Sequence, residues 1–334
     1  MTLPVVPLQV AGDLVRLVIN GITTGSIYIL LAVGLSIILG TLKFVNFAHG
    51  ALYIVGAYLG LIIAQQPRFG GKLPEWLQDL GLIDGATVGL GWGYLAALVV
   101  VPVVVFVVGL LMERFVAQPF YDRPDTDQIL LTFGLALILQ ELFRVLFGGQ
   151  SQSIAQPPWA EGSALGLPLV GDVLRFFGVS GVSTWRLVII LITAVLVGIV
   201  YLLIEYTDFG LTVRAGTVDA EMVELLGIRL SRPYLVVFGI GAALAGVAGL
   251  VGGPLVNFNP DYGGNILVPA FLTVVVGGVG SIRGAVLGGL LFGLVQAGLI
   301  QFGFAAWSEV GIYAMAAIVL LVRPEGLLGD EVVA

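Results

Sequence analysis

Long apolar runs separated by short polar segments make up most of the chain. The first run, residues 14–40, has no charged residue after Arg16, and a helix needs only about 20 apolar residues to cross a bilayer. Further runs follow at about 47–66, 92–113, 128–147, 185–204, 233–253, 266–282, 284–302 and 308–322. The pattern therefore predicts an all-α protein, a polytopic transmembrane helical bundle of about 8–10 spans, forming a single domain over residues 1–334.

The polar segments predict how the chain is oriented. Lys and Arg accumulate in short cytoplasmic loops, and a cytoplasmic loop at 205–232 would put most of these residues on the same side. We therefore expect first spans within 14–66, spans three and four within 92–147, a long extracytoplasmic loop at 148–184, and C-terminal spans within 233–323 that end inside. The basic residues then inside are Lys43, Arg114, Arg123, Arg214, Arg229, Arg232, Arg283 and Arg323, eight of the fourteen in the chain.

The charged loop at 205–232 contains the signals of a short helix. Thr217 is a candidate N-cap, acidic residues follow in the first turn, and Gly227 stands where a helix would stop. Apolar residues recur at helical spacing, so one face of this helix is predicted to be apolar. These residues are Val218, Met222, Leu225 and Leu226. A short amphipathic helix between two spans must dock on its own membrane domain or on another protein.

Composition excludes several other classes of protein. The chain is 58% hydrophobic and 10% charged, with a mean hydropathy of +1.07, so lipid must be the solvent for most of it. It has no Cys and one His, which leaves no residues for a disulfide framework, a thiol nucleophile or a His/Cys metal site, so we expect no bound metal. The net charge of −7 argues against a nucleic-acid partner.

A transporter needs an energy source, and the sequence lacks its usual signatures. There is no G-x-x-x-x-G-K-[ST] loop, because Leu73 follows the Gly71-Lys72 step and Gln66 replaces the first glycine. The predicted span centres are nearly free of ionisable groups, which an ion-coupled carrier would place there. Glu141 and Arg144, three residues apart, could simply pair with each other. We therefore expect a transport subunit rather than an enzyme, driven from outside the chain.

Four residues are candidates for a translocation path: Asn46, His49, Asn257 and Pro260. His49 either forms a capping or interhelical hydrogen bond or contacts the path, and the asparagines carry the same ambiguity. Pro260 opens the sequence PDYGG, which forms either a helix break beside a path or a surface turn. Two internal echoes fit a protein built from repeated halves. They are Val45-Asn46-Phe47 with Val256-Asn257-Phe258, and GITTGSI (21–27) with GGVGSI (277–282).

Several motifs, in order, resemble the membrane permease subunits of branched-chain amino acid and urea-type ABC importers. The likeness spans about 18–326 and rests on NGITTGSIYILLAVGLSIILG (20–40), NFAHGALYIVGAYLG (46–60), TDFGLTVRAGTVDAEMVELLGI (207–228), VVVGGVGSIRGAVLGGLLFG (274–293) and RPEGLLG (323–329). In that family the segment matching 207–228 is the cytoplasmic coupling helix that seats in the ATPase. The matching residues are Gly210, Arg214, Ala215, Asp219, Glu221, Gly227 and Ile228. Met222 and Val223 depart from the alanines usual there.

The resemblance implies a complete importer in the inner (cytoplasmic) membrane. Two ABC ATPase subunits would use ATP and Mg, while this chain would bind no cofactor. A second permease, either a related one or another copy, would complete the path, and an extracytoplasmic binding protein would deliver branched-chain or related amino acids. A permease for urea or another small amide stays open as an alternative. So does an ion-coupled secondary carrier, which would need functional carboxylates in mid-membrane.

Overall fold

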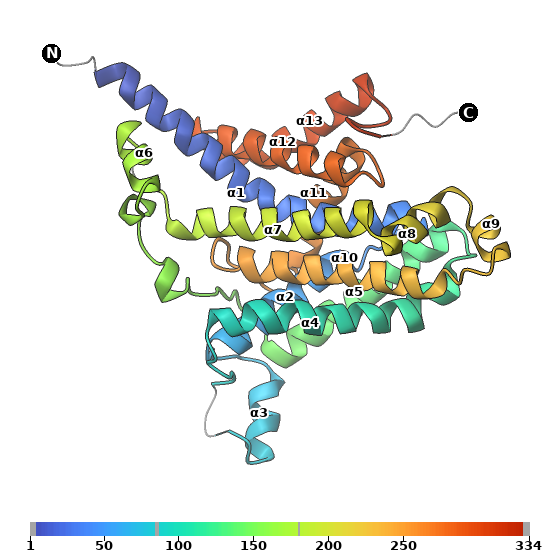
Figure 1. Ribbon diagram of the computed structural model, residues 1–334. Helices are drawn as coiled ribbons and strands as arrows, with labels where there is room; N and C mark the ends of the chain where they lie inside the picture. The colour runs from blue at the N-terminus through green and yellow to red at the C-terminus, as the bar shows by residue number, and fades with distance from the viewer. Residues whose placement is uncertain (1–4, 84–86, 180, 330–334) are drawn as a thin grey trace.

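The computed structural model describes residues 5–83, 87–179 and 181–329, and within these it contains helices and no strand. The all-α prediction is therefore confirmed. Long helices lie roughly side by side along one axis, as α4, α7 and α10 show in Figure 1. The α-helices are α1 (Val5–Leu42), α2 (His49–Ala64), α3 (Lys72–Asp79), α4 (Tyr94–Met112), α5 (Asp125–Phe147), α6 (Val170–Phe176), α7 (Thr184–Tyr206), α8 (Asp208–Val218), α9 (Ala220–Leu225), α10 (Ser231–Gly252), α11 (Tyr262–Gly277), α12 (Ile282–Gln301) and α13 (Ser308–Val322).

Seven helices in the described residues are long and apolar enough to cross a membrane. They are α1, α4, α5, α7, α10, α12 and α13. The span of α4 continues through short turns of other helix types to Phe120, and the span of α13 begins with a short turn at Ala305. The remaining apolar helices, α2 and α11, have 16 residues each. At 1.5 Å per residue each is about 24 Å long, short of the roughly 30 Å of a hydrocarbon core. These two helices therefore need non-helical chain to complete a crossing.

The segment 43–48, between α1 and α2, is one of these non-helical stretches. Its backbone groups find partners on the first turns of α5. The Val45 amide donates to the Gln128 side chain at 3.2 Å, and the Phe47 amide donates to the Thr132 hydroxyl at 3.0 Å. That hydroxyl lies 3.2 Å from the Val45 carbonyl, to which it can donate. Since lipid offers no hydrogen bonds, such side-chain partners are what permits a break in the helix at membrane depth.

The segment 253–261, between α10 and α11, is the other non-helical stretch. Phe258 and Gln152 exchange two backbone hydrogen bonds, of 2.8 and 2.9 Å. Asp261 pairs with Arg144 near the C-terminal end of α5 and accepts a hydrogen bond from Gln140. The two non-helical segments are thus held by opposite ends of α5 and the chain that follows it.

One of the two sequence echoes marks a structural equivalence. Val45–Phe47 and Val256–Phe258 lie in the two non-helical segments, each after a long helix and before a 16-residue helix. The other echo does not: Gly21–Ile27 lies inside α1, whereas 277–282 forms the turn from α11 to α12. That second prediction is wrong, because the same small residues serve helix packing in one place and a tight turn in the other. Pro269 lies within α11, which continues through it as a helix.

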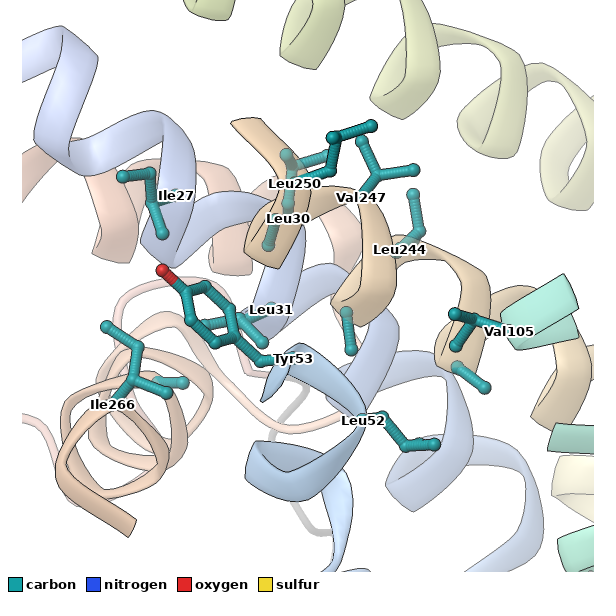
Figure 2. Packing of buried hydrophobic residues seen from close by; sticks show 14 of the residues in the cluster. Ile27, Leu30, Leu31, Leu52, Tyr53, Val105, Leu244, Val247, Leu250 and Ile266 are labelled. Carbon is teal, nitrogen blue, oxygen red and sulfur yellow. The ribbon is translucent and has the colours of Figure 1, made fainter. Parts of the chain in front are cut away.

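The core of the bundle surrounds the C-terminal half of α1, which packs against α7, α10, α11 and α12. Glycines permit the close approach: a β-carbon on Gly25 would lie 2.6 Å from the Gly289 carbonyl oxygen, and one on Gly34 would lie 2.7 Å from that of Gly241. Small residues at helix contacts are the usual device for packing in lipid. Figure 2 shows Leu30 and Leu31 of α1 within this cluster of buried side chains.

The polar segments contain more structure than the sequence predicts. Within 67–91 the short helix α3 forms, and residues 84–86 of that segment lie outside the described residues. Within 148–184 a small second core brings Ala164, Leu174, Val179 and Val182 against Val15 and Ile19 of α1. Both structures depend on docking against the bundle, which a local pattern of residues does not report.

Three basic residues meet at one end of the bundle. Lys43, Arg214 and Arg283, from three separate polar segments, line a single cavity at one end. We call this the coupling end, since it carries α8 and α9; α3 and α6 lie at the opposite end (Figure 1). The segments that carry Lys43, Arg214 and Arg283, which we predict to be cytoplasmic, therefore lie at the same end of the bundle.

This arrangement predicts that the two ends react with reagents on opposite sides of the membrane. The chain has no native cysteine, so Glu221→Cys at the coupling end and Gln156→Cys at the opposite end give single reporters. A membrane-impermeant maleimide added to intact cells should label Gln156→Cys and spare Glu221→Cys, and inverted vesicles should reverse this result. Glu75→Cys, on exposed α3, is the control for accessibility. Labelling of both main reporters from one side would refute the arrangement.

Candidate functional site

Two short helices, α8 and α9, form the centre of the 205–232 segment, and each begins at a side-chain cap. The Thr207 hydroxyl accepts from the Gly210 amide at 3.2 Å, and the Asp219 carboxylate accepts from the Met222 amide at 2.9 Å. Thr217, predicted as the cap, instead lies inside α8 and donates to the Arg214 carbonyl. That prediction is wrong because the Asp219 carboxylate reaches the free amide of the first turn, and Asp is a strong N-cap residue.

The end of α9 follows the predicted signal. The helix ends at Leu225, and Gly227 adopts φ = +85°, a left-handed conformation that glycine enters without steric cost. Its amide donates to the Glu224 carbonyl at 2.9 Å. The chain then turns sharply back towards α10.

The predicted apolar face of this segment is present and uncovered. We call it the docking face; it consists of Val218, Met222, Leu225 and Leu226. Val218 is 88% exposed and Leu225 is 76% exposed, whereas Val223, on the opposite side of α9, is buried. Exposed carboxylates of Asp219, Glu221 and Glu224 flank it, so the end of the bundle around the docking face is a charged, water-facing surface. A contiguous apolar face in such a setting indicates a protein–protein contact.

The inner side of α8 fixes it rigidly to the bundle. Gly210 is buried, and a β-carbon there would overlap the Ile204 carbonyl of α7, so the joint between α7 and α8 tolerates no larger residue. Further along, the Tyr234 hydroxyl of α10 donates to the Gly216 carbonyl at 3.2 Å. A displacement of α8 must therefore be passed on to both α7 and α10.

An ion pair joins the end of α7 to α8. The Arg214 guanidinium lies 2.7 Å from the Glu205 carboxylate and also donates to the Glu205 carbonyl at 3.1 Å. Both side chains line a cavity of 620 Å³, with Lys43 just beyond α1 and Arg283 on α12. The seven predicted coupling residues thus form two groups. Gly210 and Arg214 hold α8 in place, while the exposed group comprises Ala215, Asp219, Glu221, Gly227 and Ile228.

A buried acid lies near the same end. Glu113 is almost fully buried and accepts a hydrogen bond of 2.8 Å from the Tyr121 hydroxyl. Burial is the main cause, and the nearby Glu113 carboxylate the second, that raises the pKa of Tyr121 above its usual range. The phenol therefore keeps its proton and remains a donor.

The ion pair predicted between Glu141 and Arg144 also forms, with 2.7 Å between the carboxylate and the guanidinium.

The four candidate path residues separate into different environments. Asn46 is fully buried and its side chain accepts from the Ala48 amide at 3.0 Å, while a ring nitrogen of His49 lies 3.2 Å from the Leu31 carbonyl. The interhelical hydrogen bond considered for His49 is therefore present. Asn257 is exposed and Pro260 is buried. None of the four lines the cavities described in this section.

A second cavity, of 220 Å³, lies on the other side of the core, where α1, α2, α11 and α12 approach one another. Its polar lining includes Arg186 and the hydroxyls of Tyr28, Tyr53 and Tyr262, with the Tyr28 hydroxyl donating to the Gln296 side chain at 2.9 Å. Figure 2 shows the Tyr53 hydroxyl directed between Ile27 and Ile266. The sequence analysis did not predict this polar lining, because it considered only acidic residues and histidine as functional groups within the spans. Tyrosine and glutamine in otherwise apolar spans were the available signal.

Taken together, a lipid-embedded bundle with a solute-sized internal cavity and a rigidly mounted docking face defines a membrane transport subunit. The model of the family described as "Branched-chain amino acid transport system / permease component" matches residues 17–320, and the chain belongs to that family. The importer-permease prediction is therefore confirmed, as is the prediction of a multi-pass membrane protein. No solved structure matches the chain.

Three relatives illustrate the likeness. The chain is 30% identical over 311 residues to the high-affinity branched-chain amino acid transport system permease protein LivH of Salmonella typhimurium, covering 93% of this chain and 94% of that protein. It is 31% identical over 314 residues to the corresponding protein BraD of Pseudomonas aeruginosa, with the same coverage. It is 26% identical over 325 residues to a probable LivH of Methanocaldococcus jannaschii, covering 95% and 93%. The match thus extends along nearly the whole length of each protein.

The ion pair between Arg214 and Glu205 predicts a charge-swap rescue. Arg214→Glu places two carboxylates side by side, so α8 should lose its fixed position and ATP-driven uptake should fall at least about tenfold. Exposed ion pairs contribute only about 0.2–1 kcal/mol to stability, so expression and folding should change little. The double variant Glu205→Arg with Arg214→Glu should recover much of the uptake. If the double variant stays as inactive as Arg214→Glu, the arginine acts through some contact other than Glu205.

Proposed function

We propose that this chain is a permease subunit of an ATP-driven importer that carries branched-chain or related amino acids across the cytoplasmic membrane. Two ABC ATPase subunits, which use ATP and Mg, would supply the energy, and this chain would bind no nucleotide. A second permease would complete the translocation path, with a related chain expected and a second copy as the alternative. A binding protein outside the membrane would deliver the solute.

The observation that carries this proposal is the exposed docking face. Val218, Met222, Leu225 and Leu226 project from a segment that the rest of the bundle holds rigidly. An ATPase that closes on ATP can move such a face only if the helices behind it move with it. The Gly210 joint to α7 and the Tyr234 contact to α10 supply those connections. The segment is therefore suited to convert motion of a partner into rearrangement of the bundle.

The solute assignment draws on the family and on the second cavity. The names of these relatives give branched-chain amino acids as their solutes. The cavity here combines aliphatic walls, from Ile27, Leu255 and Ile266, with a cationic side chain and hydroxyl groups. An amino acid with an aliphatic side chain presents the complementary groups. Urea has neither an aliphatic part nor a negative charge, so this lining favours the amino acid.

The docking face predicts a specific loss of ATPase binding. In Leu225→Asp with Leu226→Asp, two carboxylates would be buried at the contact without partners, which is costly. Co-purification of the ATPase subunit with the tagged permease should fall at least about tenfold, and ATP-driven leucine uptake should fall with it. The matched control is Leu169→Asp, an equally exposed leucine (81%) at the opposite end of the bundle, which should retain the ATPase.

The solute is tested with the same proteins. The importer is reconstituted in liposomes with its binding protein. It should accumulate leucine, isoleucine and valine only when ATP is present on the side of the membrane that carries the ATPase subunits. Uptake of urea, and not of these amino acids, would show that the proposed solute is wrong.

For the docking face, the contradicting result is an ATPase that still co-purifies with the variant carrying both Leu225→Asp and Leu226→Asp.

A further inference from the structure

Arg186 lies where two cavities at the opposite end of the bundle meet. It is in the first turn of α7 and lines both the 220 Å³ cavity and a neighbouring cavity of 310 Å³. Thr24 of α1 and Ile300 of α12 also belong to both linings, so the two spaces adjoin across these three side chains. We call the 310 Å³ cavity, which Asn20 and Gln301 also line, the outer cavity. The 220 Å³ cavity, which Tyr28, Tyr53 and Tyr262 also line, is the inner cavity.

The arginine has no partner within the described chain. The hydrogen bonds and ion pairs of the described residues include none to the Arg186 guanidinium, in contrast to Arg144, Arg175 and Arg214, each of which pairs with a carboxylate. The side chain is only half-exposed, so part of its hydration is already lost. A cation inside a membrane bundle is costly, and one that is kept there without a partner points to a ligand.

The rest of the lining describes that ligand. Guanidinium groups bind carboxylates through two parallel hydrogen bonds, so the charge calls for a carboxylate. Ile27, Leu255 and Ile266 provide an aliphatic wall, and the tyrosine hydroxyls provide hydrogen-bonding groups. At 220 Å³ the inner cavity far exceeds the roughly 10–15 Å³ that a single water requires. A small carboxylate with an apolar side chain meets all of these conditions.

We propose that Arg186 binds the α-carboxylate of the amino acid as it passes from the outer to the inner cavity of this subunit. The site rests on the proposed function and extends it, because it assigns the permease its own contact with a charged group of the solute. It lies on the first turn of α7, at the end of the bundle opposite α8 and α9 (Figure 1), and neither Asn46 nor His49 lines either cavity. Solutes without a carboxylate would lack this contact.

The absence of native cysteine allows a direct test. Thr24→Cys puts a thiol at the junction of the two cavities, and its alkylation by an impermeant maleimide is followed in the assembled importer without binding protein. Millimolar leucine should slow the reaction, whereas leucinamide, which lacks the carboxylate, should not. Adding Arg186→Gln should raise the leucine concentration for half-protection at least about tenfold, since a hydrogen bond to a charged group is worth about 1.5–3 kcal/mol.

Two further variants separate a binding role from a structural one. Arg186→Lys keeps the charge and loses the planar fork, so protection by leucine should be weakened and not lost. Arg175→Gln, which removes an exposed arginine paired with Asp172 outside these cavities, should leave the half-protecting concentration unchanged. Co-purification of the other subunits with each variant verifies folding.

Several results would overturn the proposal. They are equal protection by leucine and leucinamide, no protection by leucine, no labelling of Thr24→Cys, or unchanged protection in the Arg186→Gln background. ATP-driven uptake of leucine by the parent importer is measured alongside. Uptake without protection would refute the arginine site alone, whereas the absence of any branched-chain amino acid uptake would refute the proposed function.

Discussion

Backbone hydrogen bonding in lipid is the constraint on which the rest of this structure depends. A helix satisfies its own amides and carbonyls, so most of the chain is helical where it crosses the bilayer. The two exceptions, 43–48 and 253–261, are tolerated because other parts of the chain supply the missing partners. Gln128 and Thr132 serve the first segment, and the backbone of Gln152 serves the second. Helix α5 therefore stabilises two breaks at once, although most of its surface faces outwards.

The breaks lie close to the cavities of the bundle. The second break begins α11 at Tyr262, inside the bundle, and brings the Tyr262 ring beside Tyr53 of α2, with 5.9 Å between ring centres. The inner cavity lies at this point, between two shortened helices and the long α1 and α12. At the coupling end, Gly40 and Lys43 near the end of α1 line the same cavity as Arg214 of α8. One long helix, α1, thus connects the surroundings of both cavities.

Much of the fold could be predicted from the sequence, because span length and the positions of charged residues depend on the bilayer alone. The spans, the short helix with its exposed Leu225, and the stop at Gly227 follow from local rules of hydropathy and capping. The cap at Asp219 in place of Thr217 could not be chosen, since both residues are capable caps and only the packing of α8 decides between them. The cavity around Arg186 could not be predicted either, because its lining combines side chains from five helices that are distant in the chain. Asn46 and His49 each make one hydrogen bond and keep one buried side-chain nitrogen without a partner among the described residues, which the sequence alone does not report.

The central claim is that this permease has no energy source of its own, and that a partner ATPase moves it through α8 and α9. Purification of the tagged chain from its native membranes, with identification of every co-purifying protein and assay of the product in liposomes, tests this most directly. The account predicts recovery of an ATP-binding subunit together with a second permease, and uptake that requires ATP. Recovery of the chain alone, active in liposomes without ATP, would contradict it.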